Sequence, residues 1–141
     1  MNESITLNYD VDSSDFTRAG EASSNVKRTL KLMDVDPEIV RRVAISLYEG
    51  EINMVIHSYG GEIKVIITPD EIEMVLRDKG PGIEDTELAM KAGYSTAPDN
   101  IRSLGFGAGM GLPNMKRYSD DLKIESKVGV GTTVRMKVYI S

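Results

Sequence analysis

Glycines alternate with other residues in one stretch of the chain, residues 93–117, which reads GYSTAPDNIRSLGFGAGMGLPNMKR. Gly105, Gly107, Gly109 and Gly111 lead directly into a segment of helical character. Glycine is favoured where φ must be positive or where a ligand must approach the backbone closely. Backbone N–H groups at the start of a helix, preceded by a glycine turn, form an anion site. The stretch therefore indicates either a phosphate-binding loop, with a triphosphate as the obvious ligand, or a flexible surface loop.

The size and composition of the chain limit its class. With 141 residues it has the length of one ordinary domain, which we expect to span 1–141. It has no cysteine and one histidine, which excludes disulfides, a thiolate nucleophile and a multi-histidine metal site within one chain. A net charge of -5 argues against nucleic-acid binding. We also expect no membrane contact and a cytoplasmic location, since we find no secretory signal and no apolar run near the ~20 residues that span a bilayer.

Hydrophobic periodicity predicts the secondary structure. Alternating apolar residues predict strands, and apolar residues that recur every three or four positions predict helices. Asp36 and Pro37 form a good helix start, with Asp as N-cap and Pro at the first helical position. The predicted strands are 4–11, 61–69, 71–78, 122–126 and 132–141, and the predicted helices are 19–33, 37–57, 83–93 and 111–121. This pattern predicts an α+β fold, a two-layer sandwich in which a mixed, mostly antiparallel sheet carries helices on one face.

A carboxylate stands at the end of a predicted strand, in the segment RDKGPGI. Asp78 ends this strand and precedes the turn glycines Gly80 and Gly82. A carboxylate held there can accept a hydrogen bond from an exocyclic amino group such as that of adenine, and the glycines leave room for a flat ring. The alternative is an ordinary Pro-Gly turn in which the aspartate caps the strand.

Polar residues interrupt the apolar part of the predicted helix 37–57. Glu49, Asn53 and His57 recur every four residues and share one face. Asn53 can supply an oxygen ligand to a hard cation such as magnesium beside phosphate oxygens, and Glu49 stands where a general base could polarise a hydroxyl. The alternative is a solvent-facing helix edge on which Glu49 and Glu51 are simply exposed. For His57 we favour a cation stabilised by the helix C-terminus.

The order of these features is more specific than any one of them. An E-x-x-x-N helix face, D-x-G-x-G after a strand, G-x-G-x-G before a helix and GVGTTV before the last strand form the nucleotide-binding pattern of the Bergerat ATPases. From about Ile5 to Ile140 the chain resembles the smallest branch of that superfamily, the anti-sigma factor serine kinases and the stressosome switch kinases. The segments DKGPGIEDTELAMKAGYST and GAGMGLPNMKRYSDDLKI resemble the switch kinases in particular.

The resemblance implies an ATP-binding domain of the Bergerat fold, with ATP or ADP and Mg2+ as cofactors. It implies that Glu49 is the catalytic base for an acceptor serine, that Asn53 holds magnesium and that Asp78 binds adenine. Thr132 would support Asp78, and the glycine-rich segment would close over the phosphates as a lid. The full set of residues assigned to the nucleotide is Asn53, Asp78, Gly80, Gly82, Ile83, Tyr94, Ser95, Thr96, Gly105, Gly107, Ala108, Gly109, Met110, Gly111, Leu112, Lys116 and Thr132.

The chain also departs from the family pattern. Gly50 and Glu51 stand in the helix where relatives usually carry small or apolar residues. The glycine costs about 1 kcal/mol against alanine, and it would let another backbone or the nucleotide approach closely. The lid is longer than in the switch kinases by the region APDNIRS. Arg102 is the nearest match to an arginine that reaches the phosphates in some relatives, and the extra residues leave that match open.

The sequence is compatible with two functions. The first is a serine/threonine protein kinase that transfers the γ-phosphate of ATP to a serine of a small regulatory protein of the anti-sigma-antagonist type. The second is a nucleotide-gated binding switch, in which ATP or ADP sets the lid and a partner such as a sigma factor or response regulator is held or released. The resemblance also suggests a homodimer that pairs through the first strand and helix. A detached sensor histidine kinase domain would share the fold, but the sequence contains no recognisable dimerisation helix with a phospho-acceptor histidine.

Overall fold

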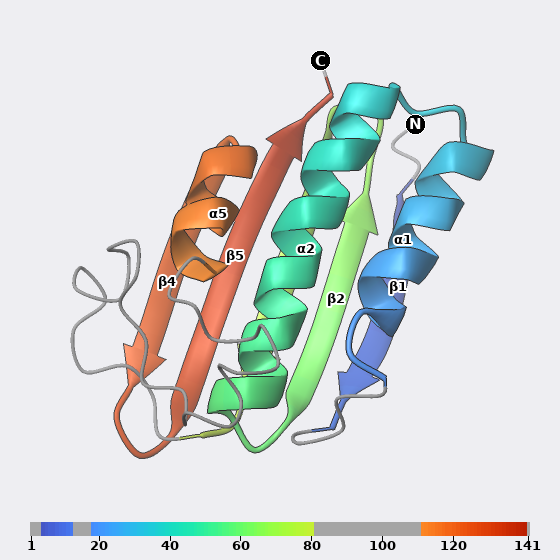
Figure 1. Ribbon diagram of the computed structural model, residues 1–141. Coiled ribbons are helices and arrows are strands. Elements are labelled where there is room, and N and C mark those ends of the chain that lie inside the picture. The colour runs from blue at the N-terminus through green and yellow to red at the C-terminus, as the bar shows by residue number, and fades with distance from the viewer. Residues whose placement is uncertain (1–3, 13–17, 81–110, 141) are drawn as a thin grey trace.

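The computed structural model describes residues 4–12, 18–80 and 111–140. In these parts of the chain the elements follow one another as Figure 1 shows. They are β1 (Ile5–Val11), α1 (Glu21–Leu32), α2 (Pro37–His57), β2 (Gly61–Ile67), β3 (Glu71–Asp78), α5 (Gly111–Tyr118), β4 (Asp121–Lys127) and β5 (Gly131–Tyr139). Each of them overlaps an element that the periodicity predicts, and the predicted helix 83–93 lies outside the described residues.

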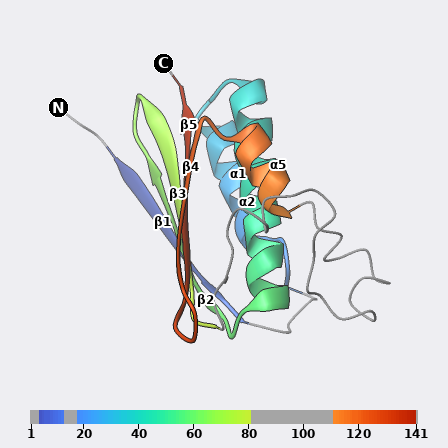
Figure 2. The same cartoon turned by 90° about the vertical axis from the view of Figure 1, so that its left-hand side faces the viewer.

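The described elements form two layers. The sheet has the strand order β1-β2-β3-β5-β4, and all four pairings between these strands are antiparallel. The described helices cover one face of the sheet (Figure 2), and α2 lies between α1 and α5 (Figure 1). The prediction of an α+β two-layer sandwich is confirmed. The sheet, expected to be mixed, is antiparallel throughout the described strands.

Alternation along the strands directs apolar side chains toward the helices and polar ones away from them. In β5, Val134 and Met136 are buried and Arg135 between them is exposed. Burying each such apolar side chain contributes about 1.5–3 kcal/mol relative to leaving it exposed, so packing rather than helix propensity holds the layers together. The core is completed from β2, β3, α1 and α2 by Ile63, Val65, Ile67, Ile72, Met74, Leu76, Val26, Leu30, Val40, Val43 and Leu47.

Helix α2 begins as the sequence predicts. The side chain of Asp36 accepts a hydrogen bond from the N–H of Glu38 at 2.8 Å. Pro37 occupies the first helical position, where a missing N–H costs nothing. The helix ends at His57, and Gly60, with a φ of 103°, turns the chain toward β2.

Helix α1 begins slightly later than the predicted residue 19, and a remote carboxylate caps it. Its N-cap is Gly20, which has a φ of 97° and no side chain to satisfy the first N–H groups. Glu51 of α2 accepts hydrogen bonds from the backbone N–H groups of Ala22 and Ser23 instead, each at 3.1 Å. Because the Glu51 residue is only 3% exposed, the alternative that places it at a solvent-facing edge is wrong.

Glu51→Ala is expected to lower the free energy of unfolding by about 3 kcal/mol. The change leaves two N–H groups without their acceptor and removes a negative charge from a helix N-terminus. Glu51→Gln keeps an acceptor oxygen and should lose less. Urea unfolding measures both, with Glu62→Ala at an exposed position of β2 as a control that should change by less than about 0.5 kcal/mol. A Glu51→Ala protein as stable as the wild type would contradict this role.

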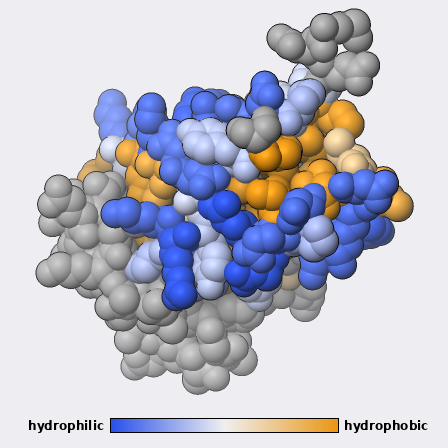
Figure 3. All heavy atoms as spheres, turned by 90° about the horizontal axis from the view of Figure 1, so that it is seen from above, coloured by the Kyte–Doolittle hydropathy of each residue, from blue (hydrophilic) through white to orange (hydrophobic). Residues whose placement is uncertain are grey.

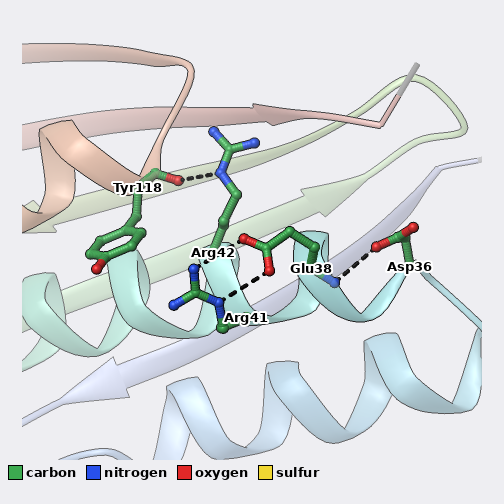
Figure 4. A network of polar contacts seen from close by, with 5 residues as sticks. All are labelled: Asp36, Glu38, Arg41, Arg42 and Tyr118. Carbon is green, nitrogen blue, oxygen red and sulfur yellow. Dashed lines mark hydrogen bonds and ion pairs between the residues drawn. The ribbon is translucent and has the colours of Figure 1, made fainter.

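Helix α5 ends at Tyr118, earlier than the predicted residue 121, and Arg42 of α2 holds that end. The Nε of Arg42 donates to the carbonyl oxygen of Tyr118 at 3.2 Å (Figure 4), and its Nη2 donates to Asp120 at 2.9 Å. The other carboxylate oxygen of Asp120 accepts from the N–H of Tyr139 in β5. Because Arg42 contacts the end of α5 and Glu49, later in α2, contacts Asn114 near its start, the two helices run in opposite directions, and α5 starts beside the second half of α2 (Figure 1).

The two ends of the sheet differ. At the end seen from above in Figure 3, hydrophobic surface lies between hydrophilic residues. This end holds the start of β1 and the end of α1, where Ile5, Leu32 and Met33 are exposed. At the opposite end, the lower one in Figure 1, α2 and β3 finish and β5 begins. No helix in the described ranges is long and apolar enough to span a membrane.

Candidate functional site

Asp78 is the last residue of β3 and stands at the lower end of the sheet. Its Oδ1 accepts a hydrogen bond from the backbone N–H of Thr132 at 2.9 Å. Its Oδ2 has no hydrogen-bond partner among the residues that the structure describes. Burial, the larger influence, raises the pKa of Asp78, and the bond from Thr132 lowers it. Within the described residues, the carboxylate therefore has one oxygen fixed by the protein and a second oxygen that is not used as an acceptor.

Thr132 lies beside Asp78, where the resemblance places it, and its backbone makes the contact. The hydroxyl of Thr132 is instead hydrogen-bonded to the hydroxyl of Ser126 in β4, with 2.8 Å between the two oxygens. This second bond ties the start of β5 to the end of β4. The N–H that holds Asp78 is thereby fixed by two neighbouring strands.

Two glycines let the neighbouring strands approach Asp78 closely. Gly61 is paired with Asp78 in the sheet, and a Cβ at Gly61 would lie 2.1 Å from the carbonyl oxygen of Arg77. A Cβ at Gly131 would lie 2.2 Å from the carbonyl oxygen of Asp78, and Gly131 has a φ of 152°. Both contacts are with backbone, so a larger residue at either position would displace the strand end that carries the carboxylate.

The backbone that follows Asp78 is also held from two sides. The N–H of Lys79 donates to the carbonyl oxygen of Gly60 at 3.0 Å, and the N–H of Gly80 donates to the carbonyl oxygen of Val130 at 3.2 Å. Gly80 is buried. The strand end therefore keeps a defined conformation up to the limit of the described segment.

Glu49 faces α5 from the middle of α2. Its Oε1 accepts a hydrogen bond from the side-chain amide of Asn114 at 3.3 Å. Glu49 is half-buried, so the alternative in which it is simply exposed is wrong. Burial, the larger influence, raises the pKa of Glu49, and the bond from Asn114 lowers it. Glu49 and Glu51 thus point to opposite flanks of α2, one toward α5 and the other toward α1.

Asn53 lies one helical turn beyond Glu49, toward the lower end of the sheet. Because α2 and α5 are antiparallel, Arg42 is level with the end of α5 and Glu49 is level with Asn114. One more turn along α2 brings Asn53 to the level of Gly111, where α5 begins. Asn53 is half-buried, and its amide makes no hydrogen bond to any other described residue. Among the described residues, an amide without a hydrogen-bond partner and a helix N-terminus therefore come to the same level.

Gly50 sets how closely α2 packs against its neighbours. A Cβ at this position would lie 2.4 Å from Cδ2 of Leu76 in β3 and 3.3 Å from the sulfur of Met115 in α5. The space that the missing side chain leaves is therefore filled by core side chains. This packing brings α2 close to both β3 and α5, the elements that carry Asp78 and Asn114.

The side chain of Asn53 offers an oxygen ligand that suits a hard cation. Magnesium prefers oxygen ligands, keeps several waters, and is usually bound through one or two protein groups together with substrate phosphates. The amide oxygen of Asn53 fits such a set. No group of three or more His, Cys, Asp or Glu side chains that could hold a metal ion occurs within the described ranges.

The remaining predicted site residues divide into two groups. Leu112 is buried in the core, so its side chain is not offered to a ligand, and Lys116 is exposed on α5. The helix N-terminus at Gly111 is described, as is the backbone of His57 at the end of α2. Outside the described residues lie Gly82, Ile83, Tyr94, Ser95, Thr96, Arg102, Gly105, Gly107, Ala108, Gly109 and Met110.

Sequence reasoning missed three residues that build this region. Asn114 has no periodic or motif signal, because its partner Glu49 lies 65 residues away. The role of Glu51 as a cap for α1 also depends on a distant contact, although a charged residue among apolar helix positions was a usable signal. Gly61 could be recognised from the sequence only as the first residue of a predicted strand.

A cavity of about 690 Å3 lies on the other flank of α2, between α1 and β1. Its lining includes Tyr9, Gly20, Tyr48 and Glu51. None of the residues predicted to bind nucleotide lines it within the described part of the chain. The predicted nucleotide residues that the structure describes gather instead around the lower end of α2, β3 and the start of α5.

Comparison with known proteins identifies relatives of this arrangement. The family model described as "Histidine kinase-, DNA gyrase B-, and HSP90-like ATPase" matches residues 35–140. An anti-sigma F factor of Caldanaerobacter subterraneus subsp. tengcongensis is 35% identical over 113 residues, which cover 75% of this chain and 76% of that protein. An anti-sigma F factor of Clostridium botulinum is 34% identical over 125 residues, which cover 83% of this chain and 84% of that protein.

A solved structure supports the same fold. The mycobacterial sensor histidine kinase MprB aligns with a TM-score of 0.55 over 96% of this chain and 97% of that chain, at 19% sequence identity. The family match covers the described α2, β2, β3, α5, β4 and β5, which carry Glu49, Asn53, Asp78 and Thr132. The chain therefore belongs to the family of histidine kinase-, DNA gyrase B- and HSP90-like ATPases.

Proposed function

We propose that this protein is an ATP-dependent serine/threonine kinase of the anti-sigma factor type, which phosphorylates a serine of a small regulatory protein in the cytoplasm. Membership of the ATPase family and identity of about 35% to anti-sigma F factors support the proposal. The observation that carries it is the arrangement around the second half of α2, where the carboxylate of Asp78, the amide of Asn53 and the start of α5 come from three neighbouring elements. Within the described residues, Oδ2 of Asp78 and the amide of Asn53 have no hydrogen-bond partner.

Asp78 binds the adenine ring in this proposal. An ionised carboxylate is an acceptor only, and the N–H of Thr132 already fixes Oδ1. The available Oδ2 accepts a hydrogen bond from the exocyclic amino group of adenine. The pairing is selective for a base with a donor at that position, because a base with an acceptor there would face a carboxylate.

The phosphates lie between Asn53 and the start of α5. Backbone N–H groups at a helix N-terminus and the positive end of its dipole favour an anion. Asn53 contributes an oxygen ligand to magnesium, which neutralises charge on the phosphate oxygens when it is bound. The glycine-rich segment before Gly111 is the proposed lid, with backbone amides as further ligands of the phosphates.

Glu49 acts as the general base. Its carboxylate accepts the proton of the serine hydroxyl as the serine oxygen bonds to the γ-phosphorus. The bond between that phosphorus and the oxygen bridging to the β-phosphate breaks, and ADP leaves with the electron pair. Phosphoryl transfer depends mainly on positioning and charge neutralisation, so a site of this size is sufficient.

A nucleotide-gated binding switch is the second candidate. The relatives are named anti-sigma factors, a name for proteins that act against a sigma factor, and this favours a role in holding a partner. ATP or ADP would then set which partner is bound, with little catalysis. The partner would be a sigma factor, a response regulator or an antagonist protein.

Two measurements test the proposal. Thermal unfolding with MgATP or MgADP should show stabilisation, about 2.7 kcal/mol when the ligand is present at 100 times its dissociation constant. The purified chain with [γ-32P]ATP, added to an extract of source cells that lack its gene, should label a protein on serine. Stabilisation without labelling favours the binding switch, and the absence of both contradicts the proposed function.

A further inference from the structure

The contact between Asn114 and Glu49 is unusual for its surroundings. It is a polar pair, 3.3 Å between Nδ2 and Oε1, in an interface between α2 and α5 that also contains the fully buried Met115. Asparagine is a poor helix former, and α5 has only eight residues, Gly111–Tyr118. The amide therefore has no evident role in forming the helix that carries it.

The backbone around this pair is fixed on both sides. Arg42 holds the end of α5 through the carbonyl oxygen of Tyr118, and Gly50 allows Met115 to pack tightly against α2. The amide of Asn114 therefore approaches Glu49 from a direction that the helix packing sets. A donor in a fixed position restrains a flexible acceptor more than a mobile donor would.

Glu49 needs such a restraint if it is to work as a base. A glutamate side chain loses up to about 1.5–2 kcal/mol of rotamer entropy when it is ordered. The Asn114 bond takes one carboxylate oxygen, and the other, Oε2, has no hydrogen-bond partner among the described residues. Within the described residues, Asn114 thus holds one oxygen, and the second is not used by another group.

We infer that Asn114 is a positioning residue, which holds the carboxylate of Glu49 so that its second oxygen faces the acceptor hydroxyl. The inference rests on the proposed function, because it gives Glu49 the role of base. It adds a residue of α5 to the transfer site and couples the base to the helix whose N-terminus faces the phosphates.

Three substitutions of Asn114 distinguish the effect of its N–H donor from the effect of its side-chain shape. Asn114→Ala removes the amide, Asn114→Asp keeps the shape but cannot donate when ionised, and Asn114→Gln keeps an amide on a longer chain. Asn8→Ala, at an exposed position of β1, is the matched control. Each protein is added with saturating Mg[γ-32P]ATP to the extract that lacks the gene, and the initial labelling rate and the dissociation constant of MgATP are measured.

The labelling rate should fall about 10- to 100-fold in Asn114→Ala and at least as far in Asn114→Asp, since misplacement of a reacting group by about 1 Å has an effect of this size. The dissociation constant of MgATP should change by less than about twofold, and Asn114→Gln should recover part of the rate. Asn8→Ala should match the wild type. Wild-type labelling by Asn114→Ala, or a loss of labelling explained entirely by weaker MgATP binding, would overturn the inference.

A second readout is independent of transfer. The pKa of Glu49, followed by carboxyl 13C NMR without nucleotide, should rise in Asn114→Ala because the bond that lowers it is gone and burial remains. Asn8→Ala should leave it unchanged, and an unchanged pKa in Asn114→Ala would also overturn the inference. If the wild type labels no protein, the proposed function fails and the inference fails with it. An active wild type with an equally active Asn114→Ala overturns the inference alone.

Discussion

Asp78→Asn is expected to weaken MgATP binding at least about 100-fold while the protein stays folded. The asparagine oxygen can still accept the bond from the N–H of Thr132, as Oδ1 does now. Its amide nitrogen then replaces the available carboxylate oxygen and presents a donor to the amino group of adenine, which is also a donor. Two donors facing each other in a half-buried site leave both unsatisfied, which costs more than losing one ordinary bond.

The same substitution should leave the stability of the free protein unchanged or slightly higher. Burial raises the pKa of Asp78 in the folded state above its value in the unfolded chain. The resulting contribution to stability is therefore present below the unfolded pKa and is lost as the pH rises through the folded pKa. At neutral pH the ionised carboxylate opposes folding, and asparagine removes that penalty.

Isothermal titration calorimetry with MgATP and thermal unfolding of the free protein measure the two effects. Asp10→Asn, at an exposed position of β1, is the matched control and should bind MgATP as the wild type does. Wild-type affinity in Asp78→Asn would exclude Asp78 as the adenine acceptor. If Asp78→Asn is folded but binds no detectable MgATP, the carboxylate at this strand end serves ligand binding and not the stability of the fold.

Glu49→Gln is expected to lower the rate of phosphoryl transfer strongly and to retain MgATP binding. The amide oxygen can still accept the bond from Asn114, but an amide cannot take a proton from a serine hydroxyl. Loss of a general base typically lowers the rate by about 10²- to 10⁴-fold. Glu49→Ala should give the same result for transfer and should also leave the Asn114 amide without its partner.

The pH dependence of transfer gives an independent check on Glu49. Burial raises its pKa, so the fraction of ionised base begins to fall at a higher pH than for a solvent-exposed glutamate. As the pH is lowered, the transfer rate at saturating MgATP should therefore begin to fall at a higher pH than it would with an exposed glutamate as the base. The residual rate of Glu49→Gln should not show this fall. Glu62→Gln, at an exposed position of β2, is the control and should keep the wild-type profile. Full transfer by Glu49→Gln would exclude Glu49 as the base.

Local patterns predicted the fold because they depend on nearby residues. The strict alternation around Val134 and Met136 defined β5, and Asp36 with Pro37 defined the start of α2. Asp78 was predictable for the same reason, since a charged residue at the end of an alternating strand is visible in the sequence. The two-layer architecture followed from the order of strands and helices along the chain, whereas the strand order β1-β2-β3-β5-β4 was not predicted.

Contacts across the fold could not be predicted in this way. The bonds from Asn114 to Glu49 and from Ala22 to Glu51 join residues that are far apart in the chain. They depend on the register between helices, which is set by side-chain packing at Gly50 and by the Arg42 contact. Residues 81–110, which include the glycines of the predicted lid up to Gly109, lie outside the described part of the chain, and the roles assigned to them stay predictions.

The central claim is that Asn53, Asp78 and the start of α5 form one nucleotide site. A crystal structure with Mg2+ and a non-hydrolysable ATP analogue tests it most directly. We expect the adenine amino group at Oδ2 of Asp78, with the phosphates between Asn53 and Gly111 and the metal at the Asn53 oxygen. A nucleotide bound elsewhere, such as in the cavity between α1 and β1, or no nucleotide at all at saturating concentration, would contradict the claim.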